Sequence, residues 1–90
     1  MRVNRFEWDI RNVRHIGRHG VKPDEAEEAF QNEPVFRKGR SGFHILYGRT
    51  EEGRYLFVVY VRKSGGVIRI VTTRNMTPTE RRYYRRQRGE

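Results

Sequence analysis

The pattern of apolar positions changes at about residue 35, from helical spacing to the alternation of strands. Before that point, residues 9–19 and 23–31 each carry apolar side chains three or four residues apart, which predicts two amphipathic helices. Asp9 is placed to cap the first helix, and Pro23 suits the first position of the second helix. The first third of the chain is therefore expected to be mainly helical.

After residue 35, four stretches have the composition of strands and are separated by short turns that contain glycine. Such spacers favour hairpins, which predicts an antiparallel meander of about four strands. The third stretch is apolar on both faces, so we expect it in the middle of the sheet, with helices covering one side. The four stretches are residues 35–38, 43–49, 54–62 and 67–74.

The last element has a clear start signal. Thr77-Pro78-Thr79-Glu80 forms a capping box with proline at the first helical position, so a helix should run from there to about Arg86. Residues 87–90 are expected to be a frayed tail. Because 90 residues suit one small core, we expect residues 1–90 to form a single α+β domain. It would contain two N-terminal helices, an antiparallel sheet of about four strands and a C-terminal helix.

The positive charge is concentrated in the second part of the chain. Residues 1–34 carry six basic and seven acidic side chains, whereas residues 35–90 carry fourteen basic and four acidic ones. Seventeen of the twenty basic residues are arginine, whose planar fork suits phosphate contacts. This distribution favours a polyanionic partner such as nucleic acid; the alternatives are a solvated surface or an interface for an acidic protein.

Several classes of function are disfavoured by composition. The chain has no cysteine, which removes disulfides and thiol nucleophiles. It has no apolar run of the roughly 18 residues that a membrane span needs, and its first residues lack a signal-peptide core, so we expect a cytoplasmic protein without membrane contact. The absence of a glycine-rich phosphate loop disfavours nucleotide hydrolysis, and no cofactor is expected.

Candidate catalytic residues are found near the first helix and the last strand. His15 and His19 are four residues apart, so both imidazoles lie on one helix face, where either could transfer protons. The same spacing can hold a metal, but no further ligand is spaced to complete a site, and we expect none. Arg69 interrupts the alternation of a strand in which Ile68, Ile70 and Thr72 would share the other face. Arg74 ends that strand.

Metal-free RNA cleavage is a chemistry that such residues could perform. The 2′-hydroxyl of the substrate attacks the adjacent phosphorus, so the enzyme supplies a base, an acid and cations rather than a nucleophile. Tyrosines of the last helix could stack on bases, although at least one is expected to pack on the sheet. The residues expected to contact nucleic acid are Arg18, Arg62, Arg81, Arg82, Arg85 and Tyr84.

Several separated stretches together resemble the BrnT family of toxins. They are FEWD at 6–9, RHGV at 18–21, EEAF at 27–30, GRT at 48–50, GRYLFVVYV at 53–61, IRIVTTR at 68–74 and MTPTERRYY at 76–84. The resemblance implies a RelE-like, metal-independent ribonuclease toxin of a type II toxin–antitoxin system that inhibits translation. The closing arginines of the family's last strand fall on Arg69 and Arg74, and Asn12 stands where a lysine is usual.

The resemblance also implies a BrnA-like antitoxin with a ribbon-helix-helix part, which would bind operator DNA as a complex with the toxin. Two other functions stay open from the residues alone. One is a non-catalytic nucleic-acid-binding or regulatory module that uses the same arginines, and the other is an interaction protein that docks an acidic partner. A homodimer is a further option, because a sheet edge and an arginine-rich helix could each support self-association.

Overall fold

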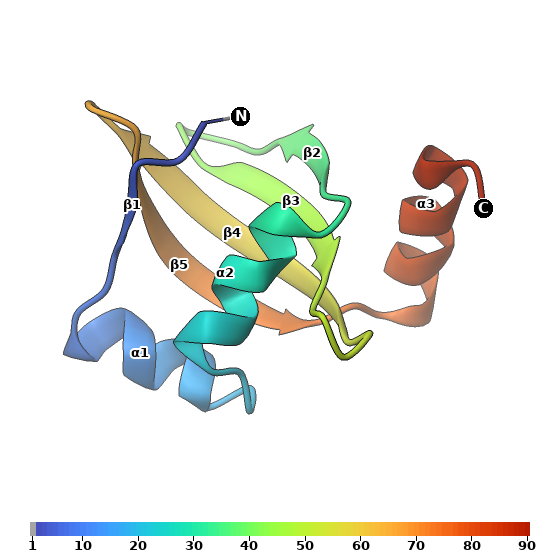
Figure 1. Ribbon diagram of the computed structural model, residues 1–90, viewed down its shortest axis with the longest axis horizontal. Coiled ribbons are helices and arrows are strands. Elements are labelled where there is room, and N and C mark those ends of the chain that lie inside the picture. Colours follow the sequence, from blue (N-terminus) through green and yellow to red (C-terminus); the bar gives the residue numbers. More distant parts are fainter. Residues whose placement is uncertain (1) are drawn as a thin grey trace.

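The computed structural model describes residues 2–90, which form one five-stranded sheet and three helices (Figure 1). The strand order β1-β5-β4-β3-β2 places β4 in the middle of the sheet. The α+β class, with two N-terminal helices and one C-terminal helix, is confirmed. The elements are β1 (Arg5–Glu7), α1 (Ile10–Gly17), α2 (Pro23–Gln31), β2 (Val35–Lys38), β3 (His44–Arg49), β4 (Tyr55–Lys63), β5 (Val67–Asn75) and α3 (Pro78–Arg88).

The expected meander is present, but the sheet contains one strand more than the sequence predicts. Strands β2, β3, β4 and β5 pair antiparallel in chain order, whereas β1 lies parallel to β5 at the opposite edge. Three residues are too few to show the alternation by which strands are recognised. In this register Glu7 lies beside Arg69, so the missed strand brings a carboxylate to the last strand.

Helices α1 and α2 cover one face of the sheet and form the main core with it (Figure 1). Gly48 on β3 allows α2 to come close, because a Cβ at this position would lie 2.3 Å from the backbone oxygen of Ala29. The fully buried aliphatic side chains of this core are Ile16, Leu46, Leu56, Val58, Ile68 and Ile70.

Helix α3 packs against the other face of the sheet, near the β2 edge. Leu46 on β3 faces α1 and α2, so the next residue, Tyr47, points to the opposite face of the sheet. There the Tyr47 ring contacts the ring of Tyr83 on α3, with centroids 5.1 Å apart. The predicted capping box is confirmed: Thr77 Oγ1 accepts from the Glu80 amide at 3.2 Å, and Glu80 Oε1 accepts from the Thr77 amide at 2.8 Å. Burial of aromatic rings then holds the helix on the sheet.

The helix extends two residues beyond the end predicted from the sequence. It ends at Arg88 and is capped by Gly89, which has the left-handed φ of 78° that favours glycine. The Glu90 carboxylate lies 3.4 Å from Arg49, so the residues expected to fray form the last helical turn and its cap. No helix within residues 2–90 combines the length and the apolar composition needed to cross a membrane.

Candidate active site between α1 and β5

A bulge in β5 decides which side chains reach the open face of the sheet, the face not covered by α1 and α2. Tyr60 pairs with Ile70 and Val59 pairs with Thr72, so Val71 is an extra residue without a partner. The extra residue reverses the alternation that follows it. Thr73, rather than the predicted Thr72, continues the buried face begun by Ile68 and Ile70, and it is fully buried.

The reversal also changes the relationship between the two candidate arginines. In a regular strand, residues 69 and 74 would point to opposite faces, because five is an odd spacing. With the bulge, Arg69 lies opposite Val61 and Arg74 opposite Phe57, and both are on the open face. Regular alternation along the sequence therefore did not predict that these two arginines share a face.

Asn12 links the bulge to the start of α1. Its side chain is 3% exposed, and its Nδ2 donates to the carbonyl oxygens of Glu7 and Ile70, each at 2.9 Å. Its Oδ1 accepts from the Asp9 amide at 2.8 Å. Ile70 directly precedes the extra residue Val71, so one buried amide joins β1, α1 and the bulge. Asn12 therefore has a structural role in this chain.

Arg69 and His15 line the same pocket, which has a volume of about 200 Å³ and opens between α1 and β5. Arg11 also lines it; this residue was not predicted from the sequence, although it lies four positions before His15 on the same helix face. We call this the α1–β5 pocket. Its lining residues are Arg11, Asn12, His15, Arg69, Ile70 and Val71.

Arg69 is held in place by two carboxylates. It donates to Asp9 Oδ2 at 2.9 Å, Asp9 Oδ1 at 3.3 Å and Glu7 Oε1 at 3.2 Å. These hydrogen bonds, above all those to Asp9, raise the pKa of Arg69, and the hydrogen bond from Arg69 lowers the pKa of Asp9. Glu7 also accepts from Lys63 at 2.7 Å, which is the main cause of its lowered pKa. Arg69, Asp9 and Glu7 are therefore charged at neutral pH.

The two predicted catalytic histidines are neighbours on the surface of α1 and the turn that follows. Their ring centroids are 5.9 Å apart, and both side chains are exposed. Of the two, only His15 lines the α1–β5 pocket. Arg18, which lies between the two histidines in the sequence, is also exposed. Within residues 2–90, no group of three side chains of the metal-ligating types comes together.

Arg74 lies outside the α1–β5 pocket, roughly 15 Å along the strand from Arg69. Its guanidinium donates to both Glu80 carboxylate oxygens, at 2.8 and 3.0 Å, and lies 4.1 Å from the centroid of the Phe57 ring. The hydrogen bond to Glu80 raises the pKa of Arg74. Because Glu80 belongs to the capping box of α3, Arg74 ties the end of β5 to the start of that helix.

The predicted nucleic-acid contacts on α3 divide into exposed arginines and a buried tyrosine. Arg81 and Arg85 lie against the Tyr55 ring, at 4.3 and 5.5 Å from its centroid, and Arg82 donates to Thr79 at 3.2 Å. Tyr84 has no exposed surface, and its hydroxyl donates to the Glu33 carbonyl oxygen at 2.8 Å. Its ring is therefore a core element and is not available for stacking on a base.

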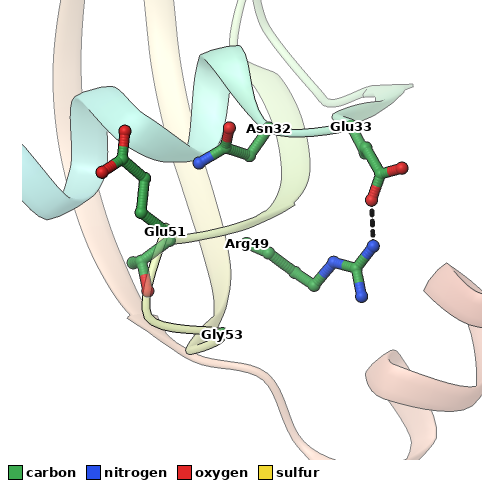
Figure 2. A pocket seen from close by; sticks show the side chains of 6 residues that line it. Asn32, Glu33, Arg49, Glu51 and Gly53 are labelled. Carbon is green, nitrogen blue, oxygen red and sulfur yellow. Dashed lines mark hydrogen bonds and ion pairs between the residues drawn. The ribbon is translucent and has the colours of Figure 1, made fainter.

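A further cavity, of about 410 Å³, lies beside the link between α2 and β2. Figure 2 shows Glu33 and Arg49 pointing toward one another across it, with Glu51 on the other side. Glu33 also accepts from Arg88 at 2.6 Å, and the hydrogen bond from Arg49 is the main cause of its lowered pKa. This ion-pair network joins the end of α3 to the link between α2 and β2.

An α+β fold that presents histidine and arginine side chains in one pocket, with further arginines on the same face, defines a small protein suited to act on a polyanion. The chain belongs to the BrnT family: residues 8–80 match the family described as ribonuclease toxin, BrnT, of type II toxin–antitoxin system. No curated protein matches the chain. The protein is therefore a ribonuclease toxin, with an RNA substrate and a cognate antitoxin, and the family predicted from the sequence is confirmed.

Proposed function

We propose that this toxin cleaves RNA in the α1–β5 pocket without a metal ion. The 2′-oxygen of the substrate forms a bond to the adjacent phosphorus while the bond to the 5′-oxygen breaks, which leaves a cyclic phosphate and a free 5′-hydroxyl. A proton leaves the 2′-hydroxyl and another is given to the 5′-oxygen. The observation that carries the proposal is that His15 and Arg69 line one pocket, together with Arg11.

Each residue has a role that its position supports. His15 takes the proton from the 2′-hydroxyl, and the neighbouring His19 supplies a proton to the leaving oxygen. Arg69 stabilises the charge that develops on the phosphate oxygens. Its hydrogen bonds to Asp9 and Glu7 use three of the five N–H groups of a guanidinium, so the side chain is held in place and keeps donors for the substrate.

The other predicted arginines would position the RNA. Arg74 is on the same open face as Arg69 and would contact a phosphate further along the strand. Arg18 lies beside the histidines, and the exposed side chains of Arg81, Arg82 and Arg85 extend the positive surface along α3. Tyr84 is left out of this set because it is buried.

The biological setting follows from the toxin class. We propose that cleavage inhibits translation in the cytoplasm and that a BrnA-like antitoxin with a ribbon-helix-helix part neutralises the toxin. The complex of the two would bind operator DNA. Co-purification with the product of a neighbouring gene, followed by a DNA-binding assay of the complex, tests this part independently of catalysis.

Cleavage of RNA by the purified protein in EDTA tests the catalytic part. We expect His15→Gln and Arg69→Ala each to lower the cleavage rate by about 10²-fold or more. Arg14→Ala is the matched control, because Arg14 is exposed on the same helix and lines no described pocket. A wild-type rate for His15→Gln would exclude this site. Salt-sensitive RNA binding without cleavage would instead support a non-catalytic binding module.

A further inference from the structure

We propose that a second RNA-binding site lies on the helix-covered face of the sheet, where it holds a single-stranded segment of the substrate outside the α1–β5 pocket. The site is a groove of about 380 Å³, within the range of roughly 300–1,000 Å³ that is usual for ligand pockets. We call it the β2–β4 groove. Its lining residues are Phe36, Arg37, Lys38, His44, Tyr60 and Arg62. The inference rests on the proposed function, because it takes RNA as the substrate.

The strand register explains how three strands build the groove. Lys38 on β2 lies opposite His44 on β3, and His44 lies opposite Tyr60 on β4. These three side chains are therefore on one face of the sheet, the face of the main core that contains Tyr60. Phe36 and Arg62 lie two residues away along their strands and share that face.

Two cations of the groove, Lys38 and Arg62, have no ion-pair partner in the part of the chain that the structure describes. No carboxylate lines it, and within residues 2–90 neither Lys38 nor Arg62 lies within ion-pair distance of an acidic side chain. Arg69 and Arg74, in contrast, are each bound to carboxylates. The β2–β4 groove thus offers free cations at neighbouring positions, which favours an anionic ligand such as consecutive phosphates.

Aromatic side chains in the groove favour a nucleic acid over an acidic protein. His44 stacks on Tyr60, with ring centroids 5.3 Å apart and an interplanar angle of 23°. This pair continues a row of rings in the core: the ring centroids of Tyr60 and Phe30 are 5.0 Å apart, and those of Phe30 and Phe6 are 5.1 Å apart. His44 is half-buried at the outer end of the row, and Phe36 is 45% exposed, so a base can stack there.

The groove lies close to Arg69 of the α1–β5 pocket, but on the opposite face of the sheet. Arg62 lies opposite Ile68, and Arg69 is the next residue of β5, with its side chain on the open face. One RNA strand passing around this end of the sheet could therefore occupy both sites. The groove would then contribute to binding of long substrates and leave the chemical step unaffected.

Binding of a fluorescent, uncleavable 2′-O-methyl RNA of about twelve nucleotides tests the groove directly. We expect Phe36→Ala and Arg62→Gln each to weaken binding about tenfold, from lost stacking and a lost phosphate contact. Phe43→Ala is the matched aromatic control, because Phe43 is 40% exposed but does not line the groove. Arg14→Gln is the matched control for charge. Both controls should bind as wild type does.

Cleavage kinetics separate failure of this proposal from failure of the proposed function. For a long RNA, we expect the groove variants to raise KM with kcat unchanged, and a dinucleotide should be cut at the wild-type rate. Cleavage by the wild type with equal affinities for Phe36→Ala and Phe43→Ala would overturn the groove alone. If the wild type neither binds nor cuts RNA, both proposals fail. Loss of antitoxin binding with unchanged RNA affinity would assign the groove to a protein partner and overturn the proposal.

Discussion

Arg69 and Arg74 extend from the same face of β5, although residues five positions apart would point to opposite faces in a regular strand. The single extra residue Val71 accounts for this relationship. It also means that one RNA strand can contact both guanidinium groups without crossing the sheet. The common orientation therefore depends on whatever keeps the bulge in place, and the structure gives that role to Asn12.

We expect Asn12→Ala to destabilise the protein by about 2–4 kcal/mol, because the buried amide satisfies two carbonyl oxygens and one backbone amide. Urea unfolding measures the change. Asn12→Asp keeps the acceptor for the Asp9 amide but loses both donors, so it should also be destabilised. An Asn12→Ala protein as stable as the wild type would show that the bulge does not need this side chain.

Asp9→Asn should increase the affinity for RNA by up to about fivefold, because it removes a charged partner of Arg69 from an exposed ion pair. Helix α1 should form normally, since asparagine caps a helix as well as aspartate does. Titration of uncleavable RNA measures the effect. Asp24→Asn serves as the control, because Asp24 is exposed on α2 and its substitution changes the net charge by the same amount. Equal gains in the two variants would argue against a direct effect on Arg69.

The Glu80 carboxylate should make stability fall at acidic pH. Burial alone would raise the pKa of Glu80, but hydrogen bonds from Arg74 and the Thr77 backbone outweigh it, and the pKa lies below its ordinary value of 4.5. Because the folded pKa is lowered, the stabilisation is present above about pH 4.5 and is lost as the pH falls through the folded value. We expect the free energy of unfolding to decrease in that range.

Glu80→Gln isolates this contribution, because glutamine keeps the capping box but carries no charge for Arg74. The variant should be less stable than the wild type at pH 7, and its stability should depend less steeply on pH below 4.5. Glu52→Gln, on an exposed turn, is the control. Urea unfolding from pH 3 to 7 gives both profiles, and identical slopes for Glu80→Gln and wild type would contradict the assignment.

Gly48→Ala should destabilise the fold by about 1–3 kcal/mol or more, because the added methyl group would overlap the Ala29 carbonyl oxygen and push α2 from β3. Gly17→Ala is a matched control on α1, where a Cβ meets no atom within 4 Å. That change should leave stability unchanged or raise it by about 0.5–1 kcal/mol. Thermal unfolding of both variants distinguishes a contact effect from a general effect of replacing glycine.

The sequence predicted those parts of the fold that depend on local signals. The capping box at Thr77 and Glu80 and the central position of β4 could both be inferred, because hydrogen-bonding side chains and apolar periodicity are visible in a few neighbouring residues. Strand β1 could not, because its pairing with β5 is a contact between segments more than sixty residues apart. Its three residues are too few to show an alternation of apolar and polar side chains.

In the candidate site, too, some features could be predicted from neighbouring residues and others depend on pairing between strands. His15 and Arg69 could be chosen from residue type and family pattern, and the structure places them in one pocket. The bulge at Val71 could not be predicted, because valine is an ordinary strand residue and the extra position appears only in the pairing with β4. Tyr83 and Tyr84 illustrate a further limit: which of the two is buried depends on where α3 meets the sheet.

The bidentate contact between Arg74 and Glu80 has a thermodynamic consequence for the toxin. A phosphate that binds Arg74 must compete with the carboxylate that ties β5 to the first turn of α3. With the proposed contact between RNA and Arg74, substrate binding and the attachment of this helix would be reciprocally coupled: each would weaken the other by the same free energy. Any partner that presses α3 more firmly onto the sheet would lower the affinity for RNA without covering a catalytic side chain.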